Sequence, residues 1–232
     1  MNNSGFDEKI KGSKYWMREM TSRGIYIEKL NSMLGTKLEW ISPTKDGSYR
    51  EFELRGCADI IGLEEGGGKA DFSFWPQRQP QWDGIALGHN DKKRVLYLFE
   101  AKAHTQELHS YCRTKSEENK RIITELLSCF QGKCYPNASF KCWMNGYYQL
   151  ANRLLFLNKV KAMKSAKYSD VKLVLIYFIN DTTYISTSEE EWLKSSQKAL
   201  RNLTGFGVVP KDVIELFVDV QDISKSRVVI PD

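Results

Sequence analysis

The sequence predicts an α/β protein with one mixed β-sheet flanked by helices, and three observations support this. Three segments carry apolar residues at helical spacing, and they are interspersed with short runs rich in β-branched and aromatic residues. The run at residues 171–179 is apolar throughout, as is typical of a strand buried on both faces. The 232 residues are 41% hydrophobic and show no repeat or long linker, so we expect a single domain spanning residues 1–232.

The first part of the chain predicts a helix followed by two hairpins. Residues 14–34 have helical periodicity, with Gly24 as a point where the helix can break and Gly35 as its C-terminal cap. Residues 38–41 and 50–54 flank a Pro-Thr-Lys-Asp-Gly turn, and we expect them to pair as a hairpin. The second hairpin is predicted to pair residues 82–87 with residues 94–103 across a polar turn.

The second part predicts two helices, a buried strand, a capped helix and a last strand. The helices are expected at residues 117–130 and 146–164, and the strand at 171–179 lies centrally in the sheet or runs parallel to its neighbours. Ser188 and Glu191 form a capping box for a helix that ends near Leu203, before Gly205. The last strand is expected at residues 213–220.

Composition limits the class of protein. No apolar run approaches the roughly 20 residues of a membrane-spanning helix, and residues 1–11 are too polar for a signal peptide. Five cysteines form an odd set without a CxxC pair, which favours reduced thiols over disulfides or zinc ligands. We therefore expect a cytoplasmic protein without a membrane partner.

The positive charge is unevenly distributed. The net charge is +5, but residues 129–172 contain eight Lys or Arg and one Asp, interleaved with aromatic residues. This mixture is typical of a surface that binds a phosphate backbone and stacks on bases. It also fits an amphipathic helix with lysines on its solvated face and aromatic residues in the core, and the sequence leaves both interpretations open.

The second hairpin carries the candidate catalytic residues. Residues two apart in a strand project from the same face, so Glu100 and Lys102 are expected to point together, with Asp83 on the neighbouring strand. Two carboxylates are hard oxygen ligands of the kind that Mg²⁺ prefers. Burying Glu100 and Lys102 in an apolar strand is costly unless they are paired or bind a cation.

Pro80-x-x-Asp83 followed by Glu100-x-Lys102 resembles the motif of the PD-(D/E)xK nuclease superfamily. The resemblance implies a restriction-endonuclease-like core of helix, three-strand meander, helix and strand, here extended by a C-terminal helix and strand. It also implies a Mg²⁺ cofactor, replaceable by Mn²⁺, held by Asp83, Glu100 and the carbonyl of Ala101. Lys102 is then expected to act on the attacking water.

Two further positions are similar to those of branches of this superfamily. Gly24-x-x-x-Glu28 resembles a motif in which the Glu joins the metal site, with Glu19 as a second choice. An exposed helical Glu is the alternative. Gln149 resembles a glutamine of recombination-associated nucleases, although Arg153 stands where those proteins carry a tyrosine.

The leading expectation is a metal-dependent DNA endonuclease of restriction, repair or defence type, with DNA as partner and a homodimer left open. One alternative is a catalytically silent module that binds nucleic acid or supports assembly on the same fold. Another is a structural domain in which Glu100 and Lys102 form a buried ion pair. The residues expected to contact nucleic acid are Gln149, Arg153, Lys159, Lys161 and Lys164.

Overall fold

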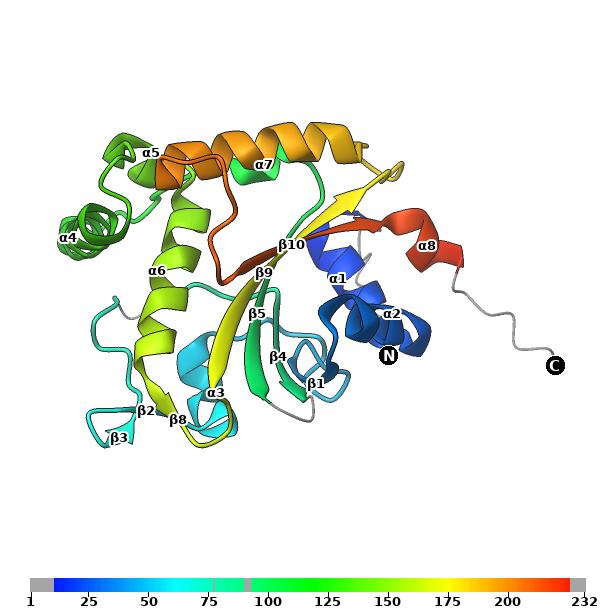
Figure 1. Cartoon of the computed structure of the whole chain (residues 1–232), viewed down its shortest axis with the longest axis horizontal. Coiled ribbons are helices and arrows are strands. Elements are labelled where there is room, and N and C mark those ends of the chain that lie inside the picture. Colours follow the sequence, from blue (N-terminus) through cyan, green and yellow to red (C-terminus); the bar gives the residue numbers. More distant parts are fainter. Residues whose placement is uncertain (1–10, 77, 90–92, 226–232) are drawn as a thin grey trace, which may run out of the picture.

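The computed structural model describes residues 11–76, 78–89 and 93–225 and shows the predicted mixed sheet flanked by helices (Figure 1). The central sheet has the strand order β1-β4-β5-β9-β10. β1, β4 and β5 pair antiparallel, whereas β5, β9 and β10 run parallel. The five strands are β1 (Lys37–Ser42), β4 (Gly84–His89), β5 (Arg94–Lys102), β9 (Asp170–Ile179) and β10 (Val213–Asp219).

Helices cover both faces of this sheet. One face packs against α1 (Ser13–Ser22), α2 (Gly24–Leu34) and α8 (Val220–Lys225). The other face carries the larger core, with α3 (Leu54–Ile61), α4 (Glu117–Cys134), α5 (Phe140–Met144), α6 (Tyr148–Ala162) and α7 (Glu189–Thr204). The remaining elements are short: β2 (Leu63–Glu65), β3 (Gly68–Lys69), η1 (Thr105–Leu108), β6 (Ser110–Tyr111), β7 (Asn145–Gly146) and β8 (Lys164–Ser165).

Side chains of β5 point alternately into these two cores, and this alternation determines on which face Glu100 and Lys102 lie. Tyr97, Phe99 and Ala101 belong to the core under α1 and α2. Leu96 and Leu98 belong to the other core, and the alternation puts Glu100 and Lys102 on that same face, toward α6.

Local signals predicted most of the elements. The N-terminal helix does break at Arg23, and Gly35 ends α2 in the left-handed conformation with φ 62°. β4 and β5 form the second hairpin, whose turn residues 90–92 lie outside the described residues. β9 is buried between two parallel neighbours, and the capping box of Ser188 and Glu191 starts α7 as expected.

The first predicted hairpin is wrong. β1 pairs with β4, and residues 50–54 form no strand; only Phe52 makes an isolated antiparallel bridge, to Trp82. Leu54 instead starts α3, a helix that the sequence analysis missed, and is fully buried there. The alternating pattern of residues 50–54 therefore reports burial of Phe52 and Leu54 and does not identify a strand partner.

Two further observations concern the whole described chain. All five cysteines are free thiols. Within the described ranges, no helix combines the length and the apolar character needed to cross a bilayer.

Candidate active site

The candidate site lies where β4 begins and β5 ends. Gly84 is paired with Phe99 in the antiparallel register, so Asp83 and Glu100 come next to each other one position further along. Gly84 allows this close approach, because a Cβ atom there would lie 2.9 Å from the Trp40 ring and 3.2 Å from Phe99. The sequence Asp-Gly thus presents a carboxylate next to a close approach of the two strands.

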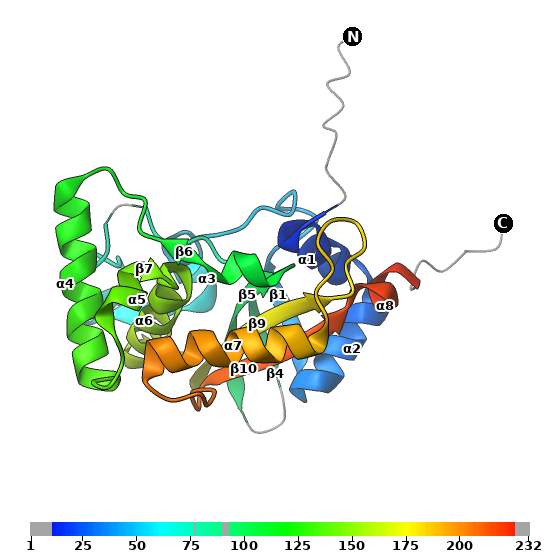
Figure 2. The same cartoon turned by 90° about the horizontal axis from the view of Figure 1, so that it is seen from above.

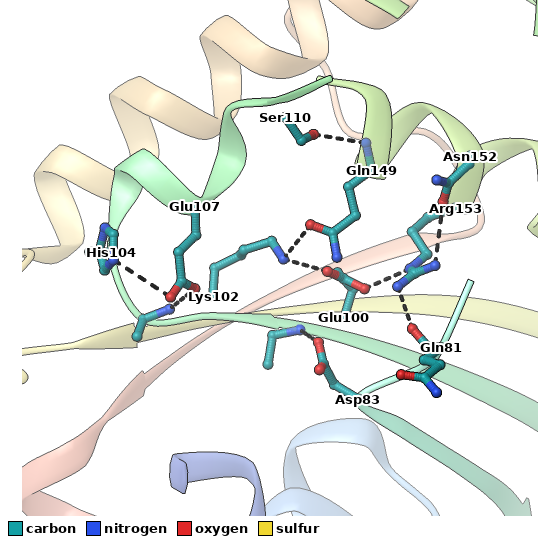
Figure 3. A network of polar contacts seen from close by, with 12 residues as sticks. Gln81, Asp83, Glu100, Lys102, His104, Glu107, Ser110, Gln149, Asn152 and Arg153 are labelled. Atoms are coloured by element: carbon teal, nitrogen blue, oxygen red, sulfur yellow. Dashed lines mark hydrogen bonds and ion pairs between the residues drawn. The ribbon is translucent and has the colours of Figure 1, made fainter. Parts of the chain in front are cut away.

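Glu100 is the centre of a buried polar network (Figure 3). Its side chain is only 2% exposed, and both of its oxygens are engaged by cations. The Lys102 Nζ donates to Oε1, and the Arg153 Nε donates to Oε2 at 2.6 Å. Burial alone would raise the pKa of Glu100, but Arg153 and Lys102 outweigh it and hold the pKa below its ordinary value.

Lys102 links the sheet to the start of α6. Its Nζ also donates to the Gln149 Oε1 at 2.9 Å, and the Gln149 backbone N–H donates to the Ser110 Oγ at 2.8 Å. Beyond Lys102, the Ala103 N–H donates to the Glu107 Oε2 at 2.9 Å. These bonds fix the end of β5 relative to η1 and α6, so the position of the Lys102 amine is defined (Figure 3).

Arg153 is held from several sides. Its guanidinium lies 4.5 Å from the centre of the Trp82 ring, and its Nη2 donates to the Gln81 carbonyl at 2.5 Å. The Nη1 donates to the Asn152 side chain at 3.3 Å. With 3% of its surface exposed, Arg153 is a buried partner of Glu100. Arg153, predicted from the sequence to contact nucleic acid, lines the cleft, and its guanidinium is engaged by Glu100, Gln81 and Asn152.

Asp83 is the carboxylate of this site that pairs with no cation among the described interactions. Its Oδ2 accepts a hydrogen bond from the Ala101 N–H at 2.7 Å. Burial, followed by the negative charge of Glu100, raises the pKa of Asp83 to about 7. A carboxylate with this pKa changes its protonation state near neutral pH, which is a common property of functional sites and not of surface carboxylates.

A cleft of about 650 Å³ opens beside this network, and Glu100 and Lys102 are not among its lining residues; we call it the central cleft. Asp83, Gln149 and Arg153 line it together with Glu51 and Glu53. The bridge between Phe52 and Trp82 brings residues 51–53 beside residues 81–83, and this long-range pairing has no local sequence signal. The sequence analysis therefore missed two cleft carboxylates. The other lining residues are Arg78, Gln79, Pro80, Gln81 and Asn152.

Comparisons with protein-family models, with curated proteins and with solved structures find no match to this chain. Its function is therefore inferred from the geometry of the site.

The donor set fits a Mg²⁺ ion only in part. Mg²⁺ is commonly held by one or two carboxylates, with waters and substrate phosphate completing the shell, and Asp83 and Glu100 supply two. The Gln149 amide oxygen is a third hard ligand nearby. Both oxygens of Glu100 are occupied by cations, so a metal would displace one of those contacts. Within the described residues, no group of three or more His, Cys, Asp or Glu is placed to hold a metal.

The structure does not bring the predicted third carboxylate to this site. Glu28 is exposed on α2, and among the described interactions none joins it to Asp83 or Glu100. Glu19 pairs with Arg23, whose Nη1 donates to the Ile223 carbonyl at 2.7 Å. Both residues belong to the helices on the sheet face opposite to Glu100.

The predicted lysines also lie away from Asp83. Lys159 follows Gln149 by ten residues in α6, a distance of about 15 Å along the helix axis. Its Nζ lies 4.9 Å from the centre of the Phe74 ring. Lys161 forms ion pairs with Asp170 and Asp212, and Lys164 is exposed in β8. Of the five residues expected to contact nucleic acid, only Gln149 and Arg153 line the cleft.

Proposed function

We propose that this protein is a divalent-metal-dependent nuclease that hydrolyses phosphodiester bonds in DNA on a restriction-endonuclease-like core. One observation carries the proposal: Asp83 lines the central cleft without a cationic partner among the described residues and lies opposite Glu100, and Lys102 projects from the same strand face as Glu100. The resemblance of these residues to the PD-(D/E)xK motif supports the reaction type. A Mg²⁺ or Mn²⁺ ion would be held by Asp83 and Glu100 and would act as a Lewis acid that activates water and stabilises negative charge on phosphate.

Three residues of this chain have separate roles in the proposed reaction. In the metal-free protein Asp83 loses its proton near neutral pH, because its pKa is raised to about 7, and the carboxylate would then be available to hold a metal. The Lys102 amine, oriented by Gln149, would hold the attacking water and stabilise charge that develops on the phosphate. Arg153 keeps Glu100 ionised, as the lowered pKa of Glu100 indicates.

A second candidate is a catalytically silent nucleic-acid-binding module, which would need no metal. The observation that favours it is the complete pairing of Glu100: both oxygens are taken by Lys102 and Arg153. In this case the buried network stabilises the junction of β5 and α6, and DNA binds the cleft without cleavage.

The deciding experiment is cleavage of supercoiled plasmid and of single-stranded DNA by the purified protein. Added Mg²⁺ or Mn²⁺ is expected to produce nicks that EDTA abolishes. Lys102→Met is expected to lose cleavage yet retain Mn²⁺ binding in calorimetry, since an ammonium group has no lone pair for a metal. A folded parent protein that binds DNA but cuts neither substrate with either metal would favour the silent module.

A further inference from the structure

The central cleft is continuous with a second hollow of about 640 Å³. The two share Arg78, Gln79, Pro80 and Asn152 as lining residues. The second hollow continues to Arg113 and Lys115 in the segment that leads into α4, which lies along the upper edge in Figure 2. A basic region therefore adjoins the site on the α4 side.

A third hollow, of about 270 Å³, adjoins the central cleft on the α1 side. Lys11, Lys14, Arg18 and Arg50 line it with the rings of Tyr15 and Tyr49, and its described lining contains no carboxylate. An ion pair of 3.1 Å between the Lys14 Nζ and the Glu51 Oε1 joins the two hollows, because Glu51 lines the central cleft. The start of α1 lies along the same upper edge in Figure 2 as the start of α4.

Aromatic rings hold several of these cations. The guanidinium of Arg113 lies 4.8 Å from the centre of the Tyr111 ring, and that of Arg18 lies 4.9 Å from the centre of the Tyr49 ring. The ring face of Tyr111 positions the Arg113 cation without neutralising its charge, so Arg113 can still attract an anion. Tyr111 is 55% exposed, and an exposed ring beside a cation suits base stacking next to a phosphate contact.

The lysines at the end of α6 lie away from the cleft, although Lys159 also contacts a ring, that of Phe74. Lys161 is neutralised by two carboxylates, Asp170 and Asp212, and lies toward the opposite end of α6 from the cleft. Residues 129–172 carry eight Lys or Arg, yet apart from the buried Arg153 the cations that adjoin the cleft come from residues 11–50 and 78–115.

We infer that a nucleic-acid strand crosses the protein through these three hollows, with its phosphates on Lys14 and Arg50 at one end and on Arg78, Arg113 and Lys115 at the other. The strand then passes directly over Asp83, between the two basic ends. This inference rests on the proposed nuclease function and specifies the path of its substrate. It replaces the path along Lys159, Lys161 and Lys164.

The test measures binding separately from cleavage. A fluorescent single-stranded oligonucleotide and the matching duplex are titrated with protein in EDTA at several salt concentrations. Three double variants are compared: Lys14→Gln with Arg50→Gln, Arg113→Gln with Lys115→Gln, and, as the control, Lys159→Gln with Lys164→Gln. Each removes two positive charges from exposed or half-buried side chains, and thermal melting verifies that each variant is folded.

Both variants along the hollows are expected to weaken binding several-fold and to flatten the slope of log K against log salt by about one unit per lost contact. The control is expected to leave that slope unchanged. The inference is wrong if only the control variant changes the slope of log K against log salt. It is also wrong if the parent protein binds neither the single-stranded oligonucleotide nor the duplex. If the parent protein cleaves DNA but neither variant along the hollows changes binding, the proposed strand path is wrong and the nuclease proposal stands. If those variants change the salt dependence of binding but the parent shows no metal-dependent cleavage, the nuclease proposal is wrong and the strand path stands.

Discussion

Two clusters of two carboxylates and two cations lie near opposite ends of the parallel strands. The first is the candidate site, with Asp83, Glu100, Lys102 and Arg153. The second joins Asp170 and Asp212, at the starts of β9 and β10, to Lys161 and Lys172. Asp170 is paired with Val95 in the register of β5, so about 17 Å of strand separates it from the level of Glu100.

The clusters differ in how their charges are connected. In the second cluster each lysine contacts both carboxylates, at 2.6 to 3.3 Å. Partial burial raises the pKa of Asp170 and of Asp212, but hydrogen bonds, including those from the two lysines, lower both pKa values below the ordinary range. In the candidate site both cations contact Glu100, and burial raises the pKa of Asp83.

This difference shows that equal numbers of charges do not make equivalent sites. A fully paired, half-exposed cluster neutralises itself and stabilises the ends of three elements. A cluster that leaves one carboxylate unpaired in a cleft retains the capacity to take a proton or a cation, at a cost in stability. Substitutions of single carboxylates can test the contrast.

The largest expected effect is on cleavage. Asp83→Asn keeps the size of the side chain and an acceptor for the Ala101 N–H, but it removes a charged metal ligand. We expect it to reduce metal-dependent nicking by more than about 100-fold, because a residue that binds the metal directly contributes at least as much to activity as the residues that orient it. Asp212→Asn is the matched control and should cleave as the parent does. Equal activities for both variants would remove Asp83 from the reaction.

The next effect is on stability, measured by urea denaturation without metal. Glu100→Ala leaves the buried Arg153 and Lys102 without their anion, and we expect a loss of about 3–5 kcal/mol. Asp170→Ala in the half-exposed cluster should cost about 1 kcal/mol or less, because Asp212 still contacts both lysines. Similar losses of unfolding free energy in the two variants would show that burial does not make the Glu100 ion pairs more stabilising than those of Asp170. Glu100→Gln is the better variant for activity assays, since it retains a hydrogen-bond acceptor.

The sequence predicted the candidate site to the extent that the site is local. Glu100, Lys102 and Asp83 come from one hairpin, and strand periodicity is enough to bring them to one place. The role of Arg153 was not predictable from such a pattern, because its contact with Glu100 joins a helix and a strand 53 positions apart. Helical periodicity shows which face of α6 is buried, and it does not show that a cation on that face meets a carboxylate.

The same distinction between local sequence signals and long-range contacts applies to the fold. α7 and β9 carry their own signals, a capping box and a continuous apolar run, and both were predicted. Residues 50–54 follow a Pro-Thr-Lys-Asp-Gly turn, which predicts a hairpin with residues 38–41, but a turn sequence does not establish which strands pair. β4 provides the neighbour of β1, and the intervening chain is used for α3 and for the carboxylates of the central cleft.

The smallest expected effect is a pair of opposite pH dependences in metal-free protein. The folded pKa of Asp83 is raised to about 7, so its contribution to stability is complete below the ordinary Asp pKa of about 3.9 and is lost as pH rises through about 7. The folded pKa of Asp212 is lowered, so its contribution is complete above about pH 4 and is lost as pH falls.

The free energy of unfolding of the parent, relative to Asp83→Asn, should therefore fall between about pH 5 and about pH 8. Relative to Asp212→Asn, it should fall as pH is lowered below about 5, and each slope is limited to about 1.4 kcal/mol per pH unit for one proton. Urea denaturation in EDTA across both pH ranges measures the two differences. A flat difference for Asp83→Asn from about pH 5 to about pH 8 would mean that Asp83 titrates as an ordinary carboxylate, and the contrast between the clusters would then rest on connectivity alone.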